Sequence, residues 1–242
     1  MNIKKFPSSV VLVAACLAAG SAHAVIVADY QFNSASDPVF LGSSDTDANS
    51  VASLITAGAG ATLDRGTEFL VAANGTSVLE VYSNSSIDQV NNLADAVDHD
   101  VSFSFTLTPE AGKTLSFTSF DGLVRRSAYS STRGWLLQSS LTGTTDLAAD
   151  SSIGSARSDA FETMTASSGS LDLSSVAELQ NVAGPVTFTI YTNPGTGSSL
   201  PSGRFVDYDN ITVSATVIPE PATAAALLGL VGLSLAFVRR RR

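Results

Sequence analysis

The stretch Val-Ser-Phe-Ser-Phe-Thr-Leu at 101–107 alternates apolar and polar side chains without a break. In an extended strand, successive side chains point to opposite faces, so the four apolar residues share one face and the three polar residues share the other. This pattern predicts a strand of an antiparallel sheet, with one side packed on a core and the other in contact with water.

Further short strands are predicted on both sides of this stretch, separated by turns rich in Gly, Ser and Asn. They cover 26–32, 77–83, 115–120, 123–127, 134–139, 186–191 and a last long strand or bent pair over 204–217. Two stretches, 87–97 and 175–182, are compatible with helix but are too short to build a helical core. The pattern therefore predicts an all-β fold, an antiparallel β-sandwich.

Two stretches rich in Ser and Thr, 42–53 and 141–158, are predicted to be loops. Such a composition is typical of solvated surface, and it also permits O-glycosylation.

The composition restricts the chemistry that this chain can carry. Of its 242 residues, one is cysteine and two are histidine, and Cys16 and His23 both lie in the first 24. If that segment is removed, the chain can form no Cys-based zinc site, iron–sulfur cluster or disulfide and has no Cys nucleophile. His99 is then the remaining imidazole for a Ser-His-Asp triad, and we predict that it lies in a loop.

Charge is unevenly distributed along the chain, whose formal net charge is −9. Residues 25–217 carry 21 acidic and seven basic side chains, a net charge of −14, whereas both ends are positive. Phosphate binding requires clustered Lys and Arg, so the acidic middle argues against nucleic acid as a partner. It suits an exported soluble domain, or one that collects cations.

The first 24 residues have the three parts of a secretory signal peptide. Two lysines come first, an apolar run follows over 10–19, and Ala22-His23-Ala24 forms a small-x-small cleavage site. We therefore predict a signal helix in domain 1–24, cleavage after Ala24 and a mature chain that starts at Val25. In an alternative interpretation, Val13-Ala14-Ala15-Cys16 resembles a bacterial lipobox, and Cys16 would then carry a lipid.

The C-terminal segment 217–242 also has three parts. Pro219-Glu220-Pro221 is rigid and non-helical, because two prolines fix the backbone and remove two hydrogen-bond donors. Residues 222–238 form an uncharged run of 17, the lower limit for a transmembrane helix. Arg239-Arg240-Arg241-Arg242 then forms a stop-transfer cluster that is expected to stay in the cytoplasm. These features predict at least a C-terminal membrane anchor.

Pro-Glu-Pro, an apolar helix and an Arg cluster, in this order and paired with a signal peptide, resemble the PEP-CTERM sorting signal. Proteins with that signal are secreted by Gram-negative bacteria that make exopolysaccharide. The resemblance implies recognition by an exosortase, a membrane protease that removes the tail near Pro219-Glu220-Pro221. It also implies export through the inner membrane, transient anchoring there, and a final location at the cell surface or in the extracellular matrix.

The body, 25–216, resembles the bodies of other PEP-CTERM proteins at 105–115, 135–141, 186–191 and 209–213. Those bodies look like jelly rolls related in shape to carbohydrate-binding modules, so a jelly-roll-like sandwich is implied here. In such modules, one acidic residue on the first strand and one on the last share a structural Ca²⁺, which implies Asp29 and Asp209. Calcium takes six to eight oxygens, so carbonyls and water would supply the rest. In the alternative, Asp207 and Asp209 are solvated residues at the end of a strand.

Six aromatic residues are candidate platforms for sugar rings, which pack an apolar face on an aromatic ring while nearby polar groups hold their hydroxyls. They are Tyr30, Tyr82, Tyr129, Trp135, Tyr191 and Tyr208. Because Trp135 lies among apolar residues, we predict that it belongs to the core. Arg125 and Arg126 are predicted to point to opposite faces of one strand; either one pairs with a buried carboxylate or both are surface residues.

The sequence favours a non-catalytic cell-envelope or matrix protein, associated with exopolysaccharide and biofilm. No catalytic residue is predicted, and no cofactor apart from the Ca²⁺ above. A module that binds glycan is the first alternative, and a secreted glycoside hydrolase or lyase, which requires two facing carboxylates in a cleft, is the second. The expected partners are signal peptidase, exosortase, the inner membrane before processing, and polysaccharide.

Overall fold

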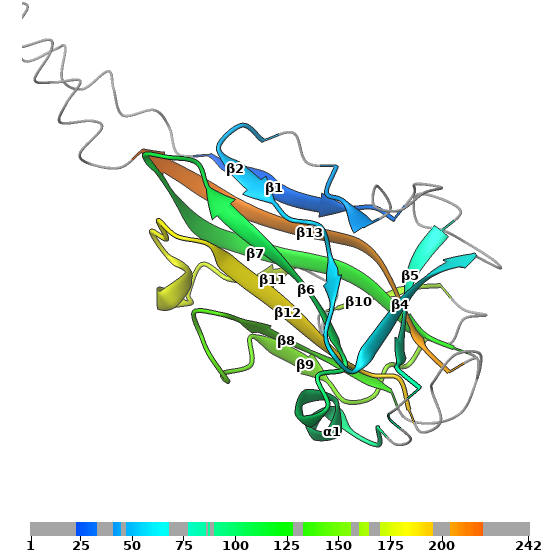
Figure 1. Ribbon diagram of the computed structural model, residues 1–242. Helices are drawn as coiled ribbons and strands as arrows, with labels where there is room; N and C mark the ends of the chain where they lie inside the picture. The colour runs from blue at the N-terminus through cyan, green and yellow to red at the C-terminus, as the bar shows by residue number, and fades with distance from the viewer. Residues whose placement is uncertain are drawn as a thin grey trace, which may run out of the picture.

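The computed structural model describes residues 23–32, 41–44, 47–67, 77–85, 87, 90–127, 133–155, 160–164, 170–195 and 204–219. These residues form two antiparallel sheets packed on each other, so the prediction of an all-β sandwich is confirmed (Figure 1). Residues 1–22 of the predicted signal segment and the predicted helix over 222–238 lie outside the described residues, and Ala24, the last residue of that signal segment, belongs to a strand. Within those residues, no helix has the length and apolar character needed to cross a bilayer.

The first sheet, which we call sheet A, has seven strands with the order β10-β7-β13-β5-β4 along its main path. Its strands are β1 (Ala24–Tyr30), β4 (Ala61–Thr67), β5 (Ser77–Ser83), β7 (Lys113–Arg126), β10 (Glu162–Thr163), β11 (Leu171–Asp172) and β13 (Val206–Pro219). The two longest strands, β7 and β13, pair along almost their whole length. Along the other edge of β13, β5 pairs with 206–208 and β1 with 211–216.

The second sheet, sheet B, has six strands with the order β2-β6-β12-β8-β9, and β3 also pairs with β6. Its strands are β2 (Ser50–Ala52), β3 (Thr56–Ala57), β6 (Ser102–Pro109), β8 (Gly134–Ser139), β9 (Ala148–Asp150) and β12 (Val186–Asn193). Helix α1 (Leu93–Asp98) precedes β6, and a 3₁₀ turn, η4 (Ala177–Leu179), precedes β12. Helix α1 contacts β12 and β8, so it lies against sheet B.

The core lies between the two sheets, as the alternation at 101–107 predicts. The apolar side chains of that stretch are at most 1% exposed. At the centre, the ring of Phe188 on β12 lies 5.8 Å from that of Phe105 and 5.3 Å from that of Phe117. Phe105 belongs to sheet B and Phe117 to sheet A, so Phe188 joins the two layers through tilted and edge-to-face aromatic contacts.

One predicted break in a strand is wrong. Residues 115–120 and 123–127 were expected as separate strands, but β7 continues through Gly122. Strand β13 stays paired with β7 on both sides of this residue, because a bulge in β13 between Asp209 and Thr212 adjusts the register. Asn210 within that bulge has a φ of 49°. At Gly122, a Cβ atom would lie 2.7 Å from Sδ of Met164, so the absence of a side chain permits the close packing of this residue.

The predictions of loops and helices are correct only in part. Strands β2 and β9 form inside the predicted loops 42–53 and 141–158. Of the possible helix at 87–97, only α1 forms, and it begins where the side chain of Asn92 accepts a hydrogen bond from the Asp95 amide. The stretch 175–182 contains no α-helix but the short turn η4.

Candidate functional site

A groove of about 420 Å³ opens on the outer face of sheet B, between α1 and the turn that joins β8 to β9. We call it the α1 groove. Its α1 wall consists of Leu93, Ala94, Val97 and Asp98, its floor of Leu136, Gln138 and Tyr191, and its turn wall of Thr144 and Asp146. An apolar floor and wall therefore meet polar side chains at the opposite side.

The strand pattern of β12 places Tyr191 on this floor. Phe188 and Ile190 are fully buried in the core, so the next side chain in the alternation points to the outer face. There, Tyr191 lies directly opposite Leu136 on β8. Tyr191 also packs against a small apolar cluster, formed by Val90, Ala96 and Val101, that α1 covers. The ring of Tyr191 is thus half-buried against this cluster.

The hydroxyl of Tyr191 stays protonated at neutral pH. Partial burial raises its pKa above the ordinary value of 10, and the negative charge of Asp100 adds to this effect. The group is therefore available to a ligand as a neutral donor and acceptor.

Two polar side chains on the groove hold each other. The Nε2 of Gln138 donates a hydrogen bond of 2.9 Å to Oδ1 of Asp146 across the β8–β9 hairpin. Within the part of the chain that the structure describes, neither Oε1 of Gln138 nor Oδ2 of Asp146 accepts a hydrogen bond. Two oriented acceptors therefore remain beside the apolar floor, where they suit the hydroxyl groups of a ligand.

Beyond the groove, the outer face of sheet B carries rows of small polar side chains. Thr189 on β12 lies between Gln138 on β8 and Ser104 on β6. In the next row, the hydroxyls of Thr106 and Thr187 lie 2.8 Å apart. Neighbouring strands are about 4.8 Å apart, so this face offers hydroxyl groups at regular spacing.

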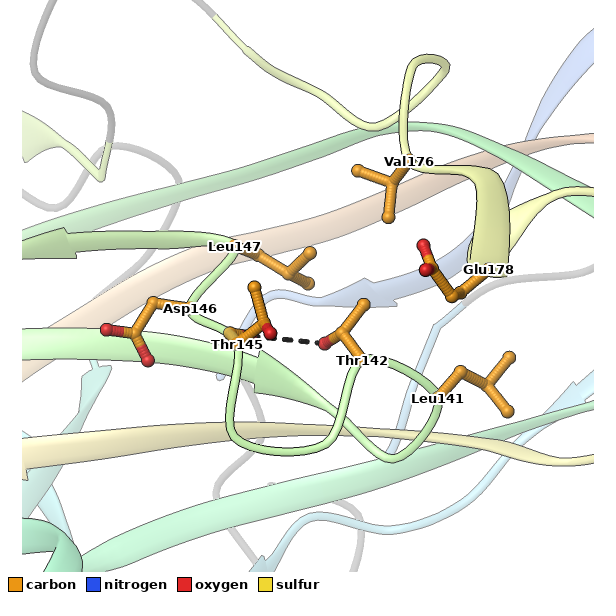
Figure 2. Close-up of a pocket in the computed structure, with 7 residues that line it drawn as sticks. All are labelled: Leu141, Thr142, Thr145, Asp146, Leu147, Val176 and Glu178. Carbon is orange, nitrogen blue, oxygen red and sulfur yellow. Dashed lines mark hydrogen bonds between the residues drawn. The ribbon is translucent and has the colours of Figure 1, made fainter.

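A smaller cleft of about 210 Å³ lies between the same turn and η4. Leu141, Leu147 and Val176 supply its apolar lining, and its two carboxylates are those of Asp146 and Glu178. Figure 2 shows the carboxylate of Glu178 near the cleft and that of Asp146 directed away from it. The two groups do not face each other, so this cleft does not offer the pair of carboxylates that glycoside hydrolysis requires.

The outer face of sheet A holds a buried ion pair. The Nε of Arg125 lies 2.8 Å from Oδ2 of Asp207, and neither side chain is exposed. The ring of Phe161 stacks on the guanidinium, 4.2 Å from its centre. This confirms that one of the two neighbouring arginines pairs with a buried carboxylate. On β5, the paired Glu80 is also buried and accepts a hydrogen bond from the Tyr82 hydroxyl.

A further buried charge was not predicted. Arg133 has no exposed surface, and its pKa is lowered to about 10, first by burial and then by the positive charges of Arg126 and Arg204. Its sequence context, at the end of a segment rich in Ser and Arg, resembles that of an ordinary surface residue, so no sequence signal marked it.

Three of the six candidate sugar platforms are wrong because they are buried: Tyr30, Tyr82 and Tyr208 are at most 4% exposed. Trp135 is 2% exposed, which confirms the prediction that it belongs to the core. The hydroxyl of Tyr208 lies 2.8 Å from that of Thr192 inside the molecule. Tyr129 lies outside the described residues, and Tyr191 has the exposure and surroundings that a platform requires.

His99 is an exposed residue that ends α1, in agreement with the predicted loop position. It is not part of the α1 groove. Sequence reasoning did not single out Gln138 and Asp146 of that groove. In the predicted strand 134–139, alternation directs the side chain of Gln138 to the outer face of the sheet. This was the one feature of the sequence that could have identified Gln138.

The predicted calcium ligands lie on adjacent strands, β1 and β13. Asp29 accepts hydrogen bonds from the side chains of Gln31 and Ser44. Asp209 accepts one from the backbone amide of Asn210. Because Asp207 and Asp209 are both buried, the alternative that they are solvated residues at a strand end is wrong. No group of three or more Asp, Glu, His or Cys side chains suited to a metal occurs among the described residues. The calcium site therefore stays a prediction.

If calcium binds there, millimolar Ca²⁺ is expected to raise the melting temperature above its value in EDTA, because a ligand that binds only the folded state stabilises it. Thermal unfolding followed by circular dichroism measures this shift, and the paired change D29N/D209N is expected to abolish it. Identical melting curves in Ca²⁺ and EDTA would remove the site from consideration.

Of the predicted sorting motif, only Pro219 is described. It is exposed and is the last residue of β13, where it pairs with Lys113. Glu220, Pro221 and the cluster Arg239-Arg240-Arg241-Arg242 lie outside the described residues.

No family model and no curated protein sequence matches this chain. Among solved structures, it is similar to TmCBM61 in complex with beta-1,4-galactotriose, at 12% identity and a TM-score of 0.29, over 72% of this chain and 90% of that one. It is also similar to the family 11 carbohydrate-binding module of the cellulase Lic26A-Cel5E of Clostridium thermocellum, at 10% identity and a TM-score of 0.33, over 80% and 95% of the two chains. A likeness of this size assigns no role to any residue of the α1 groove.

Proposed function

We propose that this protein binds a glycan in the α1 groove. The observation that carries the proposal is the half-buried ring of Tyr191, which forms an apolar floor with Leu136 beside the oriented acceptors of Gln138 and Asp146. A sugar ring has an apolar face and a rim of hydroxyl groups, so it matches a floor of this kind with polar groups at its side. The polar rows beyond the groove suit further sugar units of the same chain.

The groove is proposed to bind without catalysis. Asp98 and Asp146 stand on opposite walls, and a glycoside hydrolase also needs two carboxylates across its cleft. However, both side chains are exposed, and Asp146 is already bonded to Gln138. The general acid of such an enzyme is a carboxyl group shielded from water, which neither residue provides.

Binding is tested by titrating the full chain, held in detergent, with soluble linear polysaccharides of different linkage, using affinity electrophoresis and calorimetry. We expect retardation by at least one neutral polysaccharide and no release of reducing ends over hours. Release of reducing ends, lost in D98N or D146N, would favour the hydrolase. Absence of binding across the whole series would overturn the proposal.

We propose further that the protein is exported and sorted by an exosortase, as a component of the cell envelope or extracellular matrix. Support comes from the signal-like N-terminus and from the Pro-Glu-Pro, apolar and Arg segments at the C-terminus. The two ends of the described sandwich also agree with this, because Ala24 lies opposite Thr216 in the sheet. Both predicted membrane segments therefore join the domain at one place.

Deleting 219–242 is expected to move the protein from the membrane and surface fractions to the periplasm, because the apolar run that anchors it is lost while β13 keeps its pairing to Ile218. Fractionation of exosortase-containing cells measures the distribution. The triple change P219A/E220A/P221A is the matched control: it keeps the anchor and removes the motif, so the uncut protein is expected to accumulate in the inner membrane. Unchanged fractionation of both variants would contradict sorting.

A further inference from the structure

We infer that the α1 groove faces away from the lipid while the chain is still anchored, so that the anchored form binds a polysaccharide outside the membrane. This inference rests on the proposed glycan binding and on the predicted membrane segments. It is carried by the positions of the chain ends and of the groove in the two sheets.

Both ends of the sandwich lie at one pole, which we call the terminal pole. On β1, Ala24 pairs with Thr216, and at the end of β13, Pro219 pairs with Lys113. Lys113 begins β7 directly after the turn that follows Pro109 of β6, so this turn belongs to the same pole. In Figure 1, β13 ends beside the start of β7, far from α1.

The α1 groove lies toward the opposite pole. In sheet B, Val186 pairs with Leu107 near the terminal pole, and the ladder then runs to Tyr191, which pairs with Ser102 at the start of β6. Helix α1 and His99 come directly before that strand. The Tyr191 side of the groove floor is therefore displaced from the chain ends by most of the length of β6, and Gln138, which pairs with Thr189, lies about midway along that strand.

The length of β13 gives the scale of this displacement. Tyr208 is beside Thr192, next to the groove floor, because their hydroxyls lie 2.8 Å apart. From Tyr208 to Pro219 the strand takes eleven steps, which at about 3.3 Å each span roughly 35 Å. The predicted membrane run begins only three residues beyond Pro219, so the terminal pole is held close to the lipid.

Separation on this scale decides which ligands can reach the groove. The lipid headgroups lie several Debye lengths of about 8 Å away at physiological salt, so their charge has little effect at the floor. A polymer that extends outside the membrane reaches the groove, whereas a headgroup in the same bilayer does not. The inferred ligand of the anchored form is thus a free polysaccharide and not a membrane glycolipid.

Two labelled positions that bracket β6 test the orientation in the full chain, reconstituted in liposomes with an energy acceptor on the lipid headgroups. In a C16S background, a dye is attached at A111C, in the turn at the terminal pole, or at H99C, at the end of α1. Both native side chains are exposed, and neither lines the groove. We expect the A111C dye to be quenched several-fold more strongly than the H99C dye.

Equal quenching, or stronger quenching of H99C, would overturn the inference. If either variant fails to fold, E110C and A59C repeat the comparison at exposed positions near the same two poles. Binding of a fluorescent polysaccharide is measured on the same liposomes. Loss of binding with the quenching pattern intact counts against the proposed function alone, whereas binding with a reversed pattern counts against the orientation alone.

Discussion

Replacing Tyr191 with alanine is expected to weaken glycan binding at least tenfold, which corresponds to a loss of about 1.4 kcal/mol. The ring forms the apolar floor with Leu136, and without it a sugar face would lie over a depression filled with water. The Y191F variant keeps the ring and removes only the hydroxyl, so we expect it to retain most of the affinity. Calorimetry on the full chain gives both constants.

Because Tyr191 also packs on the cluster under α1, the alanine variant is expected to be somewhat less stable. Circular dichroism must therefore show a folded protein before its affinity is interpreted. The Q138A variant is an independent test of the groove, since it removes the hydrogen-bond partner of Asp146 and does not alter the cluster under α1. Wild-type affinity in both Y191A and Q138A would exclude the α1 groove as the binding site.

Four of the longer strands form close to where the sequence predicts them. Strands β5 and β8 were predicted to the residue, and β6 and β12 within two residues. In β6 and β12, the buried residues recur with a period of two, which is the pattern that predicted them. The short strands β2, β3, β9, β10 and β11 were missed, and so was the seven-residue β4 at one end of sheet A. The first five have only two or three residues each, and the sequence of β4, Ala-Thr-Leu-Asp-Arg-Gly-Thr, contains one large apolar residue. The extended form of all six follows from pairing with a neighbour that the local sequence does not specify.

Local sequence patterns could not predict the α1 groove, because its walls come from segments far apart in the chain. Helix α1 at 93–98 and the turn up to Asp146 meet only after β6, β8 and β12 have assembled into sheet B. The alternation of β12 does place Tyr191 outside the core. Alternation cannot show that Tyr82, an equally plausible sugar platform, is buried. In the structure, every residue of β5 is buried, including those that face away from the core.

The same burial explains why charged residues on the outer face of sheet A were difficult to assign. Alternation places Arg125, Glu80 and Asp207 on one side of the sheet, where exposure is the ordinary expectation. All three are instead buried. The sequence could suggest that an arginine pairs with a carboxylate, but it could not show that the pair is shielded from water.

This shielding makes the ion pair the place where a single substitution is expected to cost most stability. In R125M, the carboxyl group of Asp207 stays buried and loses the guanidinium whose Nε lies 2.8 Å from its Oδ2. Removing one partner of a buried pair costs about 3–5 kcal/mol. For a domain of this size, each kcal/mol lowers the melting temperature by roughly 2–4 °C, so a decrease of about 10 °C is expected.

The double variant R125M/D207L separates this cost from the loss of packing. A buried pair replaced by apolar groups of similar volume is often neutral in stability, since the desolvation of both charges is avoided. Methionine also preserves contact with the Phe161 ring that now stacks on the guanidinium. We therefore expect the double variant to melt several degrees above R125M in circular dichroism. If R125M melts like the wild type, the ion pair contributes no net stability. If R125M and the double variant melt equally low, Arg125 stabilises the sheet through its packing and its other contacts, and the ion pair with Asp207 does not.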